Sequence, residues 1–305
     1  MTEHPTRPAT QHLSIDGGSL AYELSGTTGP LVVLVHGMGD DRRAYRFLAP
    51  ALADAGYRVA AVDLRGAGES STRWSSYTRT DIAGDLLALV EHLGGPAVLV
   101  GHSIAGGAVT IAAAKAPETV SAVVELAPFT RKQSMSLGDL RDGDFRRGMV
   151  HLLATTLLGS TKAWARYLDL AYPVTGGRPA DHDARSAQIT AMLAEPGRME
   201  ALQAMGRTAP TDAGAQLAHV TCPVLVVQGS DDPDWSDPRA EGERIVADLP
   251  AGLGRLEVVP GSGHYPHVQH PSEVLALVLP FLRSTTGGTA GRAAGSAAGE
   301  GSARA

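Results

Sequence analysis

Short apolar runs rich in valine and leucine alternate along most of this chain with longer segments of helical pattern. Such alternation is typical of strand-helix-strand units built around a parallel sheet. Asp16-Gly17-Gly18 joins the first two runs and predicts an antiparallel hairpin at the sheet edge, and the later crossovers predict mostly parallel strands. The eight expected strands are Leu13–Ile15, Leu20–Leu24, Leu31–Val35, Tyr57–Val62, Ala97–Val100, Val120–Leu126, Pro223–Gln228 and Leu256–Val259.

Helical patterns follow most of these strands, and the alternation breaks once. Between Phe129 and His219 no strand is expected, and this stretch is too long for an unstructured loop in a compact domain. We therefore expect an α/β core formed by residues 1–128 and 220–283, a helical cap over residues 129–219, and a disordered tail at 284–305, which has no large apolar residue to bury. The expected helices are Ala44–Ala55, Arg79–Leu93, Ile104–Lys115, Phe145–Leu158, Lys162–Ala171, Ala187–Ala194, Pro238–Asp248 and Pro271–Leu282.

Charge and composition exclude several classes of protein. The formal net charge of −6 and a pI near 6.0 argue against nucleic acid as a partner, because binding phosphates needs clustered basic residues. The segment Met1–Ser14 lacks the apolar core of a secretory signal, and His102 and Ser103 interrupt the weakly polar run Ala97–Ala116, so no membrane span is expected. The single cysteine, Cys222, lies in an expected buried strand and suits a reducing cytoplasm. The sequence leaves the oligomeric state open.

The segment Gly101-His102-Ser103-Ile104-Ala105 has the pattern of a nucleophile at a strand-to-helix turn. A serine at the tip of such a turn has strained backbone angles, and the positions two before and two after it must be small. Gly101 and Ala105 meet that requirement, although glycine is more usual at the second position. Alone, the pentapeptide is also compatible with a serine that merely allows a helix to pack closely on a sheet. Other residues must decide whether Ser103 is a nucleophile or a structural residue.

Residues downstream supply the base and acid that a nucleophilic serine needs. His264 lies in a glycine-rich loop after the last expected strand, and Asp232 follows the preceding strand. Catalytic residues that occur along the chain in the order Ser, Asp, His are typical of one particular fold. The neighbouring carboxylates of Asp231 and Asp234 are alternatives to Asp232, although the spacing from Gly229 favours Asp232.

Two backbone amides are candidates for the oxyanion hole that stabilises a tetrahedral intermediate. His36-Gly37-Met38-Gly39 follows the strand Leu31–Val35, and its glycines allow the Met38 amide to turn toward the serine. The Ile104 amide, directly after the nucleophile, would be the second donor. One such donor typically contributes about 2.7 to 4 kcal/mol to transition-state binding.

These motifs, together with Asp63-Leu64-Arg65-Gly66-Ala67-Gly68-Glu69-Ser70, occur in the order found in the α/β-hydrolase superfamily, which the chain resembles from about Leu13 to Leu282. The resemblance implies an eight-stranded sheet with a cap inserted after the sixth strand. It also implies Ser103, Asp232 and His264 as the catalytic triad, with no cofactor and no metal. The serine argues against the dehalogenases and epoxide hydrolases of this superfamily, which have aspartate at the elbow.

Other conspicuous residues have simpler explanations. His264, His267 and His270 recur every three residues, but Pro266 and Pro271 interrupt a regular helix, so we do not expect a metal site. Structural roles are expected for His36, His102, Asp63 and Arg65. Aromatic residues that could line a cleft, or equally pack the cap, are Phe129, Trp164, Tyr167, Tyr172, Trp235 and Tyr265.

The sequence therefore predicts a serine hydrolase that cleaves a small or medium ester, lactone or thioester through an acyl-enzyme. Other reactions on the same scaffold remain alternatives, namely C–C bond hydrolysis, cofactor-free oxidation and perhydrolysis. A non-catalytic ligand receptor is a further alternative. The substrate's acyl and leaving groups are not readable, because specificity lies in the cap and the cap carries no transferable motif.

Overall fold

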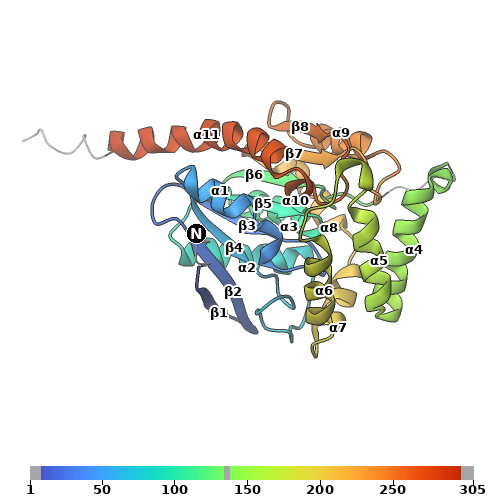
Figure 1. The fold of residues 1–305 in the computed structure, drawn as a ribbon. Coiled ribbons are helices and arrows are strands. Elements are labelled where there is room, and N and C mark those ends of the chain that lie inside the picture. Colours follow the sequence, from blue (N-terminus) through green and yellow to red (C-terminus); the bar gives the residue numbers. More distant parts are fainter. Residues whose placement is uncertain (1–7, 134–137, 297–305) are drawn as a thin grey trace, which may run out of the picture.

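The computed structural model describes residues 8–133 and 138–296. Their strands form one eight-stranded sheet in the order β1-β2-β4-β3-β5-β6-β7-β8 (Figure 1). β1 pairs antiparallel with β2 and β2 antiparallel with β4, whereas the remaining neighbours are parallel, so the predicted fold class is confirmed. The strands are β1 Thr10–Ile15, β2 Gly18–Ser25, β3 Leu31–Val35, β4 Arg58–Val62, β5 Ala97–His102, β6 Val120–Leu126, β7 Val224–Gly229 and β8 Gly254–Val259.

Helices cover both faces of the sheet and the end at which the cap lies. Short 3₁₀ helices occur at Arg42–Tyr45, Asp139–Arg141, Val174–Gly176 and Leu217–His219. The α-helices are α1 Leu48–Asp54, α2 Arg79–His92, α3 Ile104–Lys115, α4 Gly143–Leu158, α5 Thr161–Ala171, α6 His182–Leu193, α7 Arg198–Gly206, α8 Thr211–Gly214, α9 Pro238–Asp248, α10 Pro266–Gln269 and α11 Pro271–Ser296.

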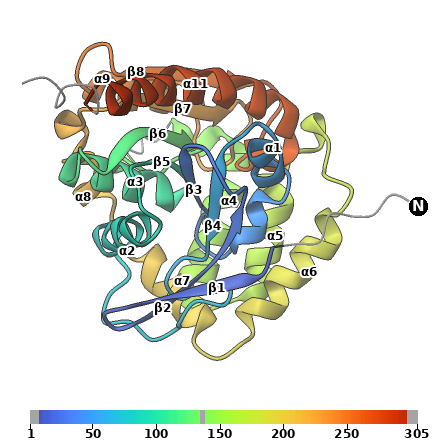
Figure 2. The same ribbon diagram turned by 90° about the vertical axis from the view of Figure 1, so that its left-hand side faces the viewer.

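The two faces of the sheet have separate apolar cores, because successive side chains of a strand point to opposite faces. In β3, Val33 belongs to the core that α2, α3 and α9 share, while Val32 and Leu34 belong to the core of α1 and α11. Figure 2 shows α2 and α3 together on one side of the strands and α1 on the other. The strands are buried on both sides, which explains why they are continuous apolar runs.

The cap consists of α4 to α8 and lies between β6 and β7, at one end of the sheet (Figure 1). Its apolar core includes Trp164, Tyr167 and Leu202, and it also contains Tyr265 from the loop after β8. The cap therefore packs directly on the loop that carries His264. No described helix combines the length and apolarity that a membrane span requires.

Several predicted boundaries are wrong. The helix expected at Ala44–Ala55 is a 3₁₀ turn followed by a shorter α1, since the Asp41 side chain caps a separate turn by accepting from the Arg43 amide. α6 begins at His182, earlier than expected, and α7 was not expected at all. Disorder was expected over 284–305, but α11 continues to Ser296, because extending a helix that has already formed costs less than starting a new one. Residues 297–305 lie outside the described residues.

Candidate active site

Ser103 lies between β5 and α3 with φ 55° and ψ −120°, in the left-handed region that serine rarely adopts. The turn is tight, since a Cβ on Gly101 would lie only 2.4 Å from the carbonyl oxygen of Ala105. The Ala105 methyl group is itself fully buried, so the departure from glycine at that position fits this elbow. This strained turn is the geometry that presents a serine hydroxyl above a parallel sheet.

His264 contacts two carboxylates rather than one. Its Nδ1 lies 2.9 Å from Asp232 Oδ2 and 3.2 Å from Asp234 Oδ2, and all three side chains are almost completely buried. Because a carboxylate only accepts, Nδ1 carries the proton, which leaves Nε2 as the basic nitrogen. Of the two alternatives to Asp232, Asp234 reaches the histidine, while Asp231 is exposed and accepts from Ser230 and Thr175.

Asp234 connects the histidine to the cap. The Tyr167 hydroxyl of α5 donates to Asp234 Oδ2 at 2.6 Å, and the Asp234 amide donates to Asp232 Oδ1 at 3.0 Å. Burial and the charge of Asp232 raise the pKa of Asp234 to about 6. Burial alone would lower the pKa of His264, but the two carboxylates outweigh it and raise that pKa to about 9.

The loop after β3 passes directly beside the nucleophile. A Cβ on Gly37 would lie 2.9 Å from Ser103 Cβ and 2.8 Å from His102 Nδ1, so only glycine permits this approach. Within the described part of the chain, the Met38 and Ile104 amides donate to no acceptor. Both residues line the same cavity as Ser103, where free amides can face a developing oxyanion.

A model described as the Alpha/beta hydrolase family matches residues 32–277, which is most of the chain. The chain belongs to this family. It is similar to 2-(acetamidomethylene)succinate hydrolase of Mesorhizobium japonicum, with 28% identity over 270 residues that cover 84% of this chain and 88% of that protein. Karrikin insensitive 2 receptor IA of Petunia hybrida is 27% identical over 266 residues, covering 85% and 93% respectively. A solved structure of a thermophilic esterase from Thermogutta terrifontis matches with a TM-score of 0.72 and 26% identity, over 91% of this chain and 99% of that one.

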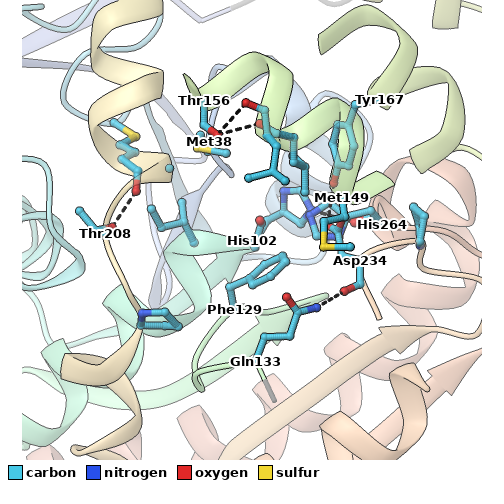
Figure 3. Close-up of a pocket in the computed structure, with 18 of the residues that line it drawn as sticks. Met38, His102, Phe129, Gln133, Met149, Thr156, Tyr167, Thr208, Asp234 and His264 are labelled. Atoms are coloured by element: carbon cyan, nitrogen blue, oxygen red, sulfur yellow. Dashed lines mark hydrogen bonds and ion pairs between the residues drawn. The ribbon is translucent and has the colours of Figure 1, made fainter. Parts of the chain in front are cut away.

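The cavity of this hydrolase lies between the sheet and the cap and has a volume of about 410 Å³. Figure 3 shows Asp234, His264 and Tyr167 grouped at one part of its wall, with Phe129 and Gln133 nearby. Its apolar lining comes mostly from the cap and includes Phe145, Met149, Leu152, Leu153, Trp164 and Met205. Of the six aromatic residues considered from the sequence, Phe129, Trp164, Tyr167 and Tyr265 line the cavity, whereas Tyr172 and Trp235 do not.

Ser103 and His264 both line this cavity, but no hydrogen bond joins their side chains in the described structure. The catalytic contact in free hydrolases is often long and tightens once substrate binds. Ser103 is 9% exposed, enough for its hydroxyl to meet a small substrate inside the cavity.

The residues expected to be structural hold the loops around the site. Asp63 accepts from the Arg42 backbone amide at 2.7 Å and from its guanidinium, while Arg65 forms a two-pronged contact with Asp85 at 2.7 Å. His36 Nε2 accepts from the Leu64 amide at 3.0 Å. His102 Nε2 pairs with the carbonyl oxygen of His264 at 2.8 Å, so the elbow and the base loop are joined.

The evenly spaced histidines are not gathered into a ligand set. His267 stacks on Tyr45 at a centroid distance of 4.9 Å, and burial lowers its pKa to about 3. Among the described residues, the group whose ligand atoms lie within 4.8 Å of one another is Asp232, Asp234 and His264. His264 Nδ1 already contacts both carboxylates, so hydrogen bonding within the group accounts for this cluster.

Sequence reasoning missed four polar residues of the cavity, namely Arg79, Gln133, Thr156 and Thr208. Arg79, from the first turn of α2, and Gln133, which donates to the Asp234 backbone carbonyl at 2.6 Å, both line it. Neither residue belongs to a catalytic motif, so only the fold brings them to the nucleophile.

Proposed function

We propose that this protein is a serine hydrolase that cleaves a small or medium carboxylic ester, lactone or thioester through an acyl-enzyme on Ser103. The observation that carries the proposal is the strained Ser103 elbow, which opens onto the same cavity as a histidine paired with buried carboxylates. Similarity to an esterase and to another hydrolase over most of the chain supports it.

In the proposed reaction, Ser103 Oγ attacks the substrate carbonyl carbon while His264 Nε2 takes the hydroxyl proton. The Met38 and Ile104 amides stabilise the oxyanion, and the C–O or C–S bond breaks as His264 returns the proton to the leaving group. Water then attacks the acyl-enzyme with the same histidine as base, which releases the carboxylic acid. Asp232 orients the imidazole and stabilises its cationic form throughout.

A fluorophosphonate probe tests the nucleophile directly. The native protein should be labelled at Ser103 and should release p-nitrophenol from short-chain esters, and Ser103→Ala should do neither. A matched control is Ser75→Ala, because Ser75 is an exposed serine outside this cavity and its loss should change nothing. Equal labelling of native protein and Ser103→Ala would exclude the proposed mechanism.

A ligand receptor on the same scaffold is a second candidate, supported by the similarity to a receptor from Petunia hybrida. The two candidates differ in turnover. A hydrolase releases product repeatedly from each protein molecule, whereas a receptor that reacts with its ligand gives at most one equivalent of product.

Product analysis with a β-diketone in the same panel detects C–C bond cleavage as an acid and a ketone.

A further inference from the structure

A positive charge lies buried in the wall of the catalytic cavity. Arg79 lines the cavity with Ser103 and is only 4% exposed. Its Nε donates to the Phe129 carbonyl oxygen at 3.1 Å, and its Nη1 lies 3.2 Å from Thr208 Oγ1 and 3.4 Å from the Thr208 carbonyl oxygen. Its Nη2 donates to no residue that the structure describes.

This guanidinium differs from the other buried arginines, which all contact carboxylates. Arg42 contacts Asp63, Arg65 contacts Asp85, and Arg185 contacts both Asp40 and Asp41. Among the described residues, no carboxylate lies within 4.0 Å of Arg79. Asp212 acts on it only from a greater distance, and accepts instead from the Thr80 hydroxyl at 2.9 Å.

Burial without a counter-ion is unfavourable for a guanidinium. Desolvation lowers the pKa of Arg79 to about 10, despite the opposing effect of Asp212. Carbonyl and hydroxyl oxygens satisfy part of its hydrogen-bonding capacity but bring no full negative charge. A planar guanidinium with an unused N–H beside a cavity is the group that best recognises a carboxylate.

The position of Arg79 relative to the nucleophile limits the ligand. Its stem packs on α3, since a Cβ on Gly107 would lie 2.7 Å from Arg79 Cδ and 3.1 Å from its Nε. Gly107 follows Ser103 by four residues, so the Arg79 stem packs on the first turn of the helix that Ser103 caps. The Phe129 amide in turn donates to the Ser103 carbonyl oxygen at 3.0 Å, so the guanidinium is also connected to the elbow.

We propose that Arg79 binds a carboxylate of the substrate, so that this enzyme prefers esters or lactones of acids that carry a second carboxyl group. The proposal rests on the proposed function of Ser103. Arg79 and Ser103 line one cavity of about 410 Å³, so the acid must be short, and monoesters of five- or six-carbon dicarboxylic acids are the substrates to test.

The kinetic test compares two substrates that differ only in charge, the mono-p-nitrophenyl ester of adipic acid and the same ester with its free carboxyl capped as a methyl ester. The native enzyme should have the higher kcat/KM for the acid. Arg79→Gln should reduce the acid-to-capped ratio by about 10- to 100-fold. Arg79→Lys should restore only part of it, because an ammonium lacks the planar fork. Arg207→Gln, which removes an exposed charge outside the cavity, should leave the ratio unchanged.

A binding measurement separates this proposal from the proposed function. Calorimetry should show adipate binding to Ser103→Ala at least tenfold more tightly than to Ser103→Ala/Arg79→Gln, whether or not any ester is hydrolysed. Thermal melting checks that each variant is folded, and Arg79→Lys replaces Arg79→Gln in both assays if the latter unfolds. Equal adipate affinities, or an acid-to-capped ratio that does not depend on residue 79, would overturn the assignment even if Ser103 is labelled and active.

Discussion

The second carboxylate beside His264 predicts an unusual gain of activity at neutral pH. Asp234 Oδ2 lies 3.2 Å from His264 Nδ1, and together with Asp232 it raises the histidine pKa from 6.5 to about 9 against the effect of burial. A general base must be unprotonated to act, so kcat/KM of the native enzyme should still be rising between pH 7 and 9. Asp234→Asn removes one negative charge and retains an oxygen that can accept from Tyr167.

An opposite charge at this distance shifts a pKa by about 1 to 3 pH units. Removing one of the two carboxylate charges should therefore lower the pKa of His264 by about 1 to 2 units. The acidic limb of the profile then moves from near pH 9 toward pH 7 to 8. At pH 7.5 the unprotonated fraction of His264 rises from a few per cent to about half, and kcat/KM rises about tenfold, provided that Asp232 still orients the ring.

The assay is kcat/KM for a p-nitrophenyl ester from pH 5 to 10, because this ratio reports the pKa values of the free enzyme. Asp231→Asn is the matched control, since Asp231 is adjacent in sequence but exposed, and its loss should not move the limb. Asp232→Asn should also move the limb to lower pH but with at least a tenfold lower plateau, because the single oxygen of an amide cannot accept from both the Asp234 amide and His264 Nδ1. An acidic limb at the same pH in native enzyme and Asp234→Asn would refute the reasoning.

Three further substitutions test the elbow, the buried acid and the loop brace. Gly101→Ala places a methyl group 2.4 Å from the Ala105 carbonyl oxygen, so it should reduce esterase activity at least 100-fold and lower the melting temperature. Glu125 is fully buried, and burial raises its pKa to about 7, so the native protein loses stability as pH rises from 4.5 to 7. The free energy of unfolding of Glu125→Gln, measured in urea relative to that of the native protein, should therefore rise by up to about 3 kcal/mol between pH 4 and pH 8. Arg42→Met leaves the Asp63 carboxylate buried without its cation and should lower the free energy of unfolding by about 3 to 5 kcal/mol in the same assay, whereas a change below 1 kcal/mol would show that the pair does not brace the loop.

Elements whose local sequence and packing agree were predictable from the chain. β3 is an apolar run buried on both faces, and α2 begins where Thr78 and Asp81 form a reciprocal cap. α7 escaped prediction because its residues have no clear apolar stripe; it is held by the buried Leu202 and Met205, which only the folded cap identifies. The continuation of α11 beyond residue 284 escaped for a different reason, since it depends on a helix already formed and not on a core of its own.

The residues of the candidate site also fall into those that the sequence predicts and those that only tertiary contacts bring together. Ser103, His264 and Asp232 could be proposed because each follows a strand at the edge where the carboxyl ends of a parallel sheet meet. The positions of these strands along the chain can be read from the sequence. Asp234 reaches Nδ1 through a tertiary contact, because Pro233 separates it from Asp232 and the cap residue Tyr167 holds its carboxylate. No spacing rule encodes a contact between a strand-end loop and a cap helix.

The sequence position of Arg79 is unusual for an arginine, and the structure shows why. It occupies the first position of α2, where the positive end of the helix dipole disfavours a cation, and a negatively charged residue would suit that position better. Local rules are broken most often at functional sites. The conflict is compounded by burial without a paired carboxylate among the described residues, so neither helix stability nor an internal ion pair accounts for this arginine. A charged ligand in the cavity beside Ser103 does, which is why the preference for an acidic substrate follows from residue 79.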